Sequence, residues 1–395
     1  MNKLKIAFAV PAIMSGHVFA AGASFDARND AMGGVGVASS NYSVAAPVNP
    51  ALVAKYKTED DFAVVLPSIG ALVADQDSLV DVFDDIDNHY KQYNDLVNSG
   101  GNAQAAAGQL SQDFKKAQGK NAAGNVGVNL QVAMPNELMS VSVFGNAYAT
   151  GIIGSNVTQS DLDYLDGVAS GTLAADPAHK FNSTAVGVVA VVQDYGIALA
   201  HKFELSGMPL YVGVTPKVQK IETFNYSANI YDYNIDDVTD DKYRSSESHV
   251  NADLGAALDV GSFTYGATIR NIISKDVTTK DVAGSQYIYQ VAPVGTIGAA
   301  YSNDWVTVAA DVDVNKTKTF KGVKDSQYAS IGTELDIAKW LQVRAGYRAD
   351  ISGEMPNVFT AGLGVSPWGV FHIDLAGQIG SDNAVGAMLT TRLML

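Results

Sequence analysis

From residue 125 to the C-terminus, apolar and polar residues alternate in segments of about ten residues. Between Trp305 and Asn315, valine and alanine occupy every second position, and Thr307 and two aspartates lie between them. A period of two places alternate side chains on opposite faces of a β-strand. Strands that are apolar toward lipid and polar toward a lumen are typical of transmembrane barrels. The pattern therefore predicts an all-β antiparallel transmembrane barrel over residues 61–395.

The number of strands follows from the connections between them. Short connections alternate with long ones, and in such barrels short turns lie in the periplasm and long loops lie outside. The short connections are 206–208, 261–262, 302–304, 338–339 and 367–368, and the long ones are 227–244, 274–288, 317–325 and 350–356. The alternation continues to the N-terminus if 181–205 is a single strand, which predicts 14 strands; 16 is the alternative. Trp305, Trp340 and Trp368 would then share one rim, as in an interfacial aromatic girdle.

Residues 76–118 interrupt the strand pattern just after the first predicted strand, 61–74. Apolar residues recur there at spacings of three and four, at Leu79, Phe83, Ile86, Tyr90, Tyr93 and Val97. This period predicts a helix capped by Asp75 or Asp77. A second helix is predicted from Ala103 to Ala117. The resulting helical hairpin is either a surface insertion or a lid over the barrel mouth.

Two segments precede the first strand. Residues 1–20 have the charged start, apolar centre and small-residue cleavage site of a secretory signal, which is more consistent with export than with a retained anchor. Residues 21–60 are rich in glycine and lack a helical or strand period. Because such a segment cannot form a core alone, we expect it to be a plug threaded into the barrel.

Composition narrows the chemistry. The chain has no cysteine, which excludes disulfides and thiol catalysis, and its formal net charge of −15 argues against nucleic-acid binding. No nucleophile motif, zinc spacing or phosphate-binding loop is present, so we expect a non-enzymatic protein without a metal or cofactor. Five aspartates between Tyr231 and Arg244 fit no defined calcium loop and predict a solvated acidic loop.

The polar positions predict two ion pairs in the lumen. The pairs are Asp253 with Arg270 and Glu334 with Arg344. The first follows from a two-residue turn at Gly261-Ser262, and the second from a three-residue turn at 338–340. Directly facing opposite charges stabilise a sheet by about 0.2–1 kcal/mol, and mutual neutralisation is their simplest role. Further expected lumen groups are Asp311, Asp313, Arg348, His372 and Asp374.

Two other features are candidate functional sites. Pro216 lies inside a predicted strand, 210–219, where its missing N–H should leave a local bulge or a sideways opening from lumen to lipid. The candidate plug residues are Arg28, Gly33, Gly34, Gly36, Asn49 and Pro50. Arg28 is expected to face lumen acids such as Asp311, Asp313 or Asp374, as a latch or as simple neutralisation.

The plug motifs resemble the start of the exported conjugative-transfer TraF proteins. The motifs are Phe25-Asp26-Ala27-Arg28, Ala31-Met32-Gly33-Gly34-x-Gly36 and Ala45-Ala46-x-x-Asn49-Pro50-Ala51-Leu52, with later matches at 194–198 and 212–217. More distantly, the plug resembles the FadL-type long-chain fatty-acid transporters. That resemblance implies a fourteen-stranded outer-membrane barrel and passive passage of hydrophobic molecules. The thioredoxin-like protein that shares the TraF name needs cysteines, which this chain lacks.

Two functions are compatible with these features. The preferred hypothesis is a monomeric barrel in the lipid of the outer membrane of a Gram-negative bacterium, which passes hydrophobic ligands such as fatty acids. The alternative is a structural protein that anchors plasmid-transfer or secretion proteins. A continuous apolar pocket beside residues 25–52 would favour transport, and a lumen filled by ion pairs and plug would favour the anchor.

Overall fold

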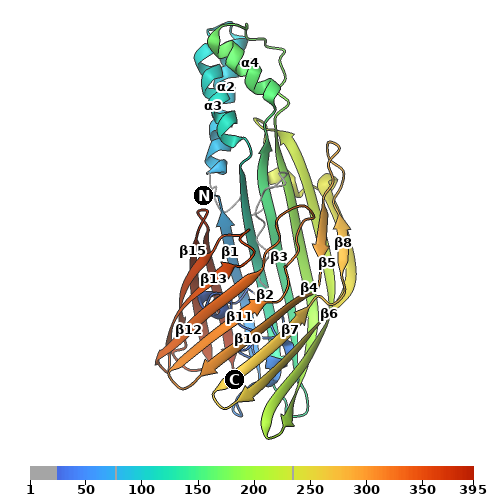
Figure 1. The fold of residues 1–395 in the computed structure, drawn as a ribbon, viewed down its shortest axis with the longest axis vertical. Coiled ribbons are helices and arrows are strands. Elements are labelled where there is room, and N and C mark those ends of the chain that lie inside the picture. The colour runs from blue at the N-terminus through green and yellow to red at the C-terminus, as the bar shows by residue number, and fades with distance from the viewer. Residues whose placement is uncertain (1–24, 76–77, 234) are drawn as a thin grey trace.

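The computed structural model describes residues 25–75, 78–233 and 235–395. The predicted signal peptide, plug residues 21–24 and Asp77 lie outside the described residues. Fourteen antiparallel strands close into one barrel, in the order β1-β16-β15-β14-β13-β12-β11-β10-β7-β6-β5-β4-β3-β2. Figure 1 shows the barrel as a ribbon. The predicted strand number is confirmed. The barrel strands are β1 (Ala63–Ala74), β2 (Asn121–Met134), β3 (Ser140–Asn156), β4 (Thr184–Leu205), β5 (Met208–Asn229), β6 (Arg244–Val260), β7 (Phe263–Arg270), β10 (Val294–Ser302), β11 (Val306–Asp313), β12 (Tyr328–Ala338), β13 (Leu341–Asp350), β14 (Val358–Val365), β15 (Phe371–Gly380) and β16 (Val385–Met394).

The predicted alternation separates an apolar exterior from a polar interior. Apolar outward side chains such as Ile297, Ile331 and Leu375 are about half exposed, whereas the inward Asp311 and Asp374 are buried. A continuous apolar exterior of this kind fits lipid and would be unfavourable in water. No helix in the described part of the chain is long and apolar enough to cross a membrane.

Short turns gather at one end of the barrel, together with the C-terminus (Figure 1). Trp305, Trp340 and Trp368 lie at three of these turns and are 76%, 51% and 77% exposed, so the predicted common rim is confirmed. One turn differs from the prediction. Ala338 pairs with Leu341, so this turn has two residues, and a register irregularity follows Asp336.

The strands are unequal in length. β4 and β5 have 22 residues each, whereas β7, β11 and β14 have 8 each. Because a strand needs only about 9–11 residues to cross a bilayer, one side of the barrel extends well beyond the membrane. The prediction that 181–205 forms one strand is confirmed, since β4 runs without interruption through 193–196.

Three helices pack on this extension, at the end opposite the C-terminus (Figure 1). They are α2 (Leu79–Asn98), α3 (Gln104–Ala117) and α4 (Gln159–Ser170). The predicted hairpin of α2 and α3 is present, and the Asp75 carboxylate accepts from the Leu79 N–H at 2.7 Å. The sequence reasoning missed α4, a helix of 12 residues with only a short apolar period.

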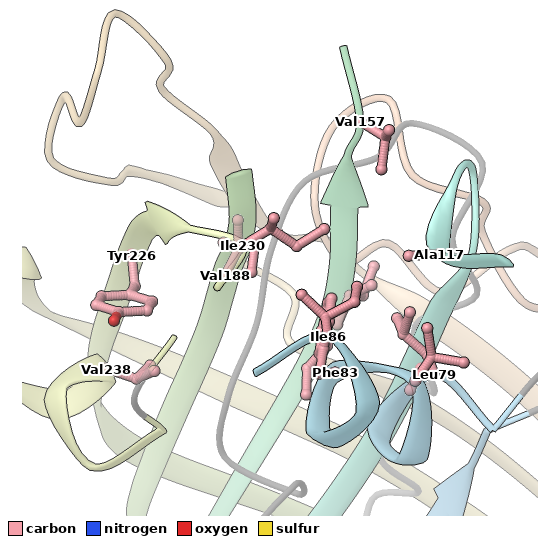
Figure 2. Close-up of a cluster of buried hydrophobic side chains, with 14 of the residues drawn as sticks. Leu79, Phe83, Ile86, Ala117, Val157, Val188, Tyr226, Ile230 and Val238 are labelled. Carbon is pink, nitrogen blue, oxygen red and sulfur yellow. The ribbon is translucent and has the colours of Figure 1, made fainter. Parts of the chain in front are cut away.

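The apolar faces of these helices join the largest apolar cluster of the molecule. Figure 2 shows Phe83 and Ile86 of α2 in one cluster with Val188 of β4 and Ile230 of the loop after β5. Val238 of the predicted acidic loop is fully buried in the same cluster; it belongs to the 3-10 turn η3 (Ile235–Thr239), which is followed by a second such turn, η4 (Asp241–Tyr243). The insertion is therefore part of a core rather than an appendage.

A small hairpin, β8 (Lys275–Thr278) and β9 (Ile288–Val291), forms a separate sheet. Tyr289 of β9 is 4% exposed and packs on Phe320, with ring centroids 5.3 Å apart. This contact joins the hairpin to the loop between β11 and β12. The sequence had suggested only a long loop at this position.

A charge placed on the lipid face tests the membrane assignment. Leu335 and Ile337 point outward from β12, and Leu335 lies farther from the Trp340 rim. We expect Leu335→Arg to reduce the free energy of unfolding by about 2–4 kcal/mol in lipid vesicles, because arginine is most costly near the bilayer midplane. Ile337→Arg is the matched control and should have a smaller effect in the same urea titration. Equal effects would contradict the assignment.

Candidate functional site

The N-terminal segment 25–60, here called the plug, lies inside the barrel. Residues 25–54 are buried or half-buried except Gly34. The helix α1 (Ala27–Ala31) contacts β13 to β16, and the 3-10 turn η2 (Pro50–Ala54) contacts β3 to β6 on the other side. The plug therefore touches most of the circumference of the wall.

Short-range hydrogen bonds shape the plug. The Asp26 carboxylate accepts from the Asn29 N–H at 3.0 Å and caps α1. Asn49 caps η2 in the same way, accepting from the Ala51 N–H at 3.1 Å, and Pro50 occupies the first position of the turn, where its missing N–H is tolerated. The Asn49 amide also donates to the carbonyls of Val37 (2.7 Å) and Ala256 (3.2 Å), which ties the turn to the plug and to β6.

A ring of lumen-facing glycines receives the plug backbone. We call it the glycine belt: Gly213, Gly255, Gly266, Gly332, Gly346 and Gly362. A Cβ atom on any of them would lie closer than 3.0 Å to plug atoms, most of them in the backbone. Backbone atoms cannot rotate away as a side chain can, so only glycine permits this approach. The belt fixes the plug against the wall.

The plug glycines have their own constraints. Gly33 and Gly34 have φ values of 79° and 86°, a left-handed conformation that favours glycine, and they turn the chain after α1. The Gly36 and Val37 N–H groups donate to one oxygen of Asp311, at 2.7 and 2.9 Å. Asp311 is thus a lumen group, as expected, but it receives backbone donors and not Arg28.

Arg28 joins the plug to the wall through Glu334. Its guanidinium contacts both carboxylate oxygens, at 2.7 and 2.9 Å, and also donates to the Ser39 carbonyl at 2.7 Å. Arg28 therefore faces a lumen acid, as expected, but that acid is Glu334 and not Asp311, Asp313 or Asp374. The other acids have different partners: Asp374 contacts Arg344 and Arg392, and Asp311 accepts from the plug backbone.

Glu334 begins an ionic network that runs along the wall. Arg344 contacts Glu334 at 2.5 Å and Asp374 at 2.6 Å, and the predicted facing positions of Glu334 and Arg344 are present in the β12–β13 register. Arg392 contacts Asp374 at 2.8 Å and approaches Asp26 of the plug at 3.9 Å. All these side chains are buried or nearly so, and each charge has an opposite partner, as buried charges require. Arg348 and Asp30 add a third link between wall and plug, at 3.7 Å.

The other predicted ion pair is wrong, although its register is right. Residues of β6 and β7 pair as the two-residue turn requires, from Val260 with Phe263 onward. Asp253, however, contacts Lys217 of β5 at 2.9 Å, and Lys217 also lies 3.5 Å from Asp194. Sequence reasoning missed Lys217 because a long loop joins β5 to β6 and leaves their register unspecified.

Pro216 interrupts the ladder between β4 and β5. Pairing stops after Gly196 with Lys217 and resumes at Leu199 with Val214, without a change of register. The result is a gap and not a bulge. Behind it lies a cluster that we call the apolar seat: Ala45, Ala46, Ala51, Leu52, Val53 and Ala54 of the plug with Phe144, Ala198, Ala200, Tyr211 and Ala257 of the wall.

Two cavities lie on opposite sides of the plug. The cavity at the short-turn end, of about 880 Å³, is lined by plug residues 38–42 and by wall residues near the short turns, including His372. The inner chamber, of about 60 Å³, lies between Pro47 of the plug and Tyr289 of the β8–β9 hairpin. Asp194, Lys217, Asp253 and Arg270 line this chamber.

Loss of the plug-to-wall ion pair should destabilise the protein. Arg28→Ala leaves Glu334 with a single cationic partner in a buried site, which we expect to reduce the free energy of unfolding by about 3 kcal/mol in detergent. Lys115→Ala removes an exposed pair with Asp166 and should cost less than about 1 kcal/mol. Equal effects in chemical denaturation would show that the Arg28 contact merely neutralises charge.

The glycine belt makes a separate prediction. A Cβ at Gly346 would meet the backbone of Met32 and Gly33, so Gly346→Ala should displace the plug at a cost of about 1–3 kcal/mol. Trypsin should then cleave at the buried Arg28. Gly377→Ala in β15 is the control, because a Cβ there meets no heavy atom within 4 Å. Unchanged resistance of Arg28 in Gly346→Ala would argue against a fixed plug.

Comparisons with solved structures identify the fold. The Ralstonia pickettii toluene transporter TbuX superposes with a TM-score of 0.57 at 11% identity, covering 95% of this chain and 99% of that one. The P. putida toluene transporter TodX gives 0.52 at 12% identity, with 95% and 99% covered. A Pseudomonas aeruginosa FadL homologue gives 0.51 at 11% identity, with 98% of each chain covered. At these identities the likeness shows the barrel fold alone.

Sequence comparison identifies the family. A search among curated proteins found no match. The family model described as "F plasmid transfer operon, TraF, protein" matches residues 46–313, more than half of the chain. The match includes the second half of the plug, η2 and the strands up to β11, and it agrees with the resemblance carried by the plug motifs. The chain therefore belongs to the TraF family of F plasmid transfer operon proteins.

Proposed function

We propose that this protein is a passive channel of the Gram-negative outer membrane for small hydrophobic molecules such as fatty acids. The observation that carries the proposal is the apolar seat directly behind the ladder gap at Pro216. Ala198 belongs to the apolar seat and lies in the part of β4 that is not paired with β5. The apolar seat therefore lies directly against the part of the wall that lacks ladder pairing. The similar fold of the two toluene transporters supports the same class of solute.

The route would run sideways through the wall while the plug stays in place. The glycine belt and the ionic network hold the plug on most sides, so plug expulsion is unfavourable. A solute that displaces the small side chains of the seat exchanges one apolar contact for another, and burial contributes about 25 cal/mol per Å² without any covalent step. Exit between β4 and β5 would deliver it to the lipid or to the periplasmic side.

A second candidate function is an anchor for a plasmid-transfer or secretion assembly. The observation that favours it is the lumen itself, which the plug and its ion pairs fill over much of the cross-section. The helical insertion does not add to this case. Phe83 is buried and Tyr90 stacks on Tyr231 with ring centroids 3.9 Å apart, so these aromatic side chains are already used within the chain.

A reversible cross-link tests the sideways route. Ala198 and Thr215 face each other across the gap by the register on either side, and the chain has no cysteine of its own. We expect the double variant Ala198→Cys/Thr215→Cys to lose uptake of labelled fatty acid when oxidised and to regain it on reduction. Gln193→Cys/Lys220→Cys joins the same strands where pairing is intact and is the control. Full uptake by the oxidised gap variant would exclude this route.

The choice between the two functions needs a strain that lacks the gene. Uptake of labelled fatty acid and of toluene should fall in that strain and return when the wild-type gene is supplied. Plasmid transfer is measured in parallel on the same cells. Normal uptake together with lost transfer would refute the channel and favour the anchor.

A further inference from the structure

Arg270 differs from every other arginine of the chain. Arg28, Arg244, Arg344, Arg348 and Arg392 each form at least one ion pair. Within the described residues, the side chain of Arg270 forms neither an ion pair nor a hydrogen bond, and its charge acts only at longer range, on Tyr148 and Asp311. A partly buried guanidinium with five unused donors is unfavourable unless something accepts from it.

The neighbouring strands explain why Arg270 has no partner. Asp253 would face it across the β6–β7 hairpin, but Lys217 Nζ lies 2.9 Å from one oxygen of Asp253 and the Asn271 N–H donates to the other at 2.7 Å. On the opposite side Arg270 pairs with Val294 of β10, which offers no side-chain acceptor. The nearest carboxylate is thus fully used by other groups.

Arg270 lines the inner chamber, whose shape limits what can enter. The chamber lies between Pro47 of the plug and Tyr289 of the β8–β9 hairpin, and its volume of about 60 Å³ is enough for a small group such as a carboxylate. Phe144 lines the chamber and also belongs to the apolar seat. A molecule held at Arg270 can therefore extend an apolar body over Phe144 toward the gap at Pro216.

We propose that the inner chamber binds a carboxylate through the guanidinium of Arg270. A planar carboxylate matches the fork of N–H donors and forms two parallel charge-assisted hydrogen bonds. Asp194 and Asp253 share the single charge of Lys217, so the chamber also holds one surplus negative charge that opposes an anion. Direct contact with Arg270 must offset this repulsion, which favours a singly charged ligand over a multivalent one.

The carboxylate has two possible sources. It is either a small free acid or the head group of an amphiphile whose tail passes over Phe144 into the apolar seat. The amphiphile as the source rests on the proposed function, because the chamber belongs to a transport route only if the protein is a channel. Acetate and octanoate carry the same head group and separate the two cases.

Binding is measured by calorimetry on the purified full chain in a non-ionic maltoside detergent without carboxylate buffers. We expect saturable octanoate binding that weakens by about tenfold or more in Arg270→Gln, because the charge and the fork are lost. Arg270→Lys keeps the charge but loses the fork of donors, so its affinity for octanoate should lie between those of wild type and Arg270→Gln. Arg244→Gln, which changes a partly exposed arginine outside the chamber, is the matched control and should bind as wild type. Tighter binding of octanoate than of acetate supports the amphiphile, and equal binding supports the small acid.

Two outcomes would overturn the proposal. One is the absence of saturable binding of either acid to the wild type, or equal binding by Arg270→Gln. The other is a loss of stability in Arg270→Gln without any change in binding, which would show that Arg270 only balances the Asp194–Lys217–Asp253 triad. Because the Arg270 side chain has no hydrogen-bond or ion-pair partner to lose among the described residues, we expect Arg270→Gln to be at least as stable as wild type.

Uptake assays separate this proposal from the proposed function. If Arg270→Gln loses octanoate binding and still takes up toluene, the chamber is a carboxylate site and the channel stands. If the deletion strain keeps normal uptake but the purified chain binds octanoate through Arg270, the channel fails and the site remains.

Discussion

The direct contact of the plug backbone with the glycine belt is the constraint on which the rest of the lumen depends. Six strands present a glycine where the plug passes, and a single Cβ at these positions would meet plug atoms closer than 3.0 Å. This approach brings α1 against β13 to β16 and thereby places Arg28 beside Glu334. Removed from water, the charges of plug and wall must pair with each other, and the ionic network is the result.

The same constraint decides which parts of the protein can move. With the plug fixed, a passage through the lumen centre would need the belt contacts and several buried ion pairs to break together. The ladder gap at Pro216 needs no such loss, because hydrogen bonds are already missing there and only small side chains lie behind it. The β8–β9 hairpin is the other element that could move without breaking the belt contacts, since it belongs to a separate sheet. It lines the inner chamber on the side of the long loops.

The sequence predicted those features that repeat or that a short turn determines. Alternation with a period of two holds in strands such as β11, β14 and β16 because lipid and lumen act on opposite faces, so the barrel and its strand number could be derived. The position of Glu334 opposite Arg344 followed from a turn that is only one residue shorter than assumed. The register of β5 on β6 depends on a long loop, and for that reason the partner of Asp253 was assigned to Arg270 instead of Lys217. Likewise, no local sequence pattern shows that the six glycines of the belt all contact the plug, because the path of the plug could not be derived from the sequence.

The error at Asp253 has a physical consequence. If Asp253 and Arg270 formed an ion pair, Lys217 would pair with Asp194 alone. The inner chamber would then contain no arginine with unused donors. In the actual arrangement Lys217 contacts both carboxylates, and the Arg270 guanidinium has no hydrogen-bond or ion-pair partner among the described residues. This arrangement reduces stability, because pairing Asp253 with Arg270 and Asp194 with Lys217 would give all four charges a partner. Arg28, Arg344, Arg348 and Arg392 each have an ion-pair partner in the lumen. An arginine without one is more readily explained by a ligand that completes it than by a structural role.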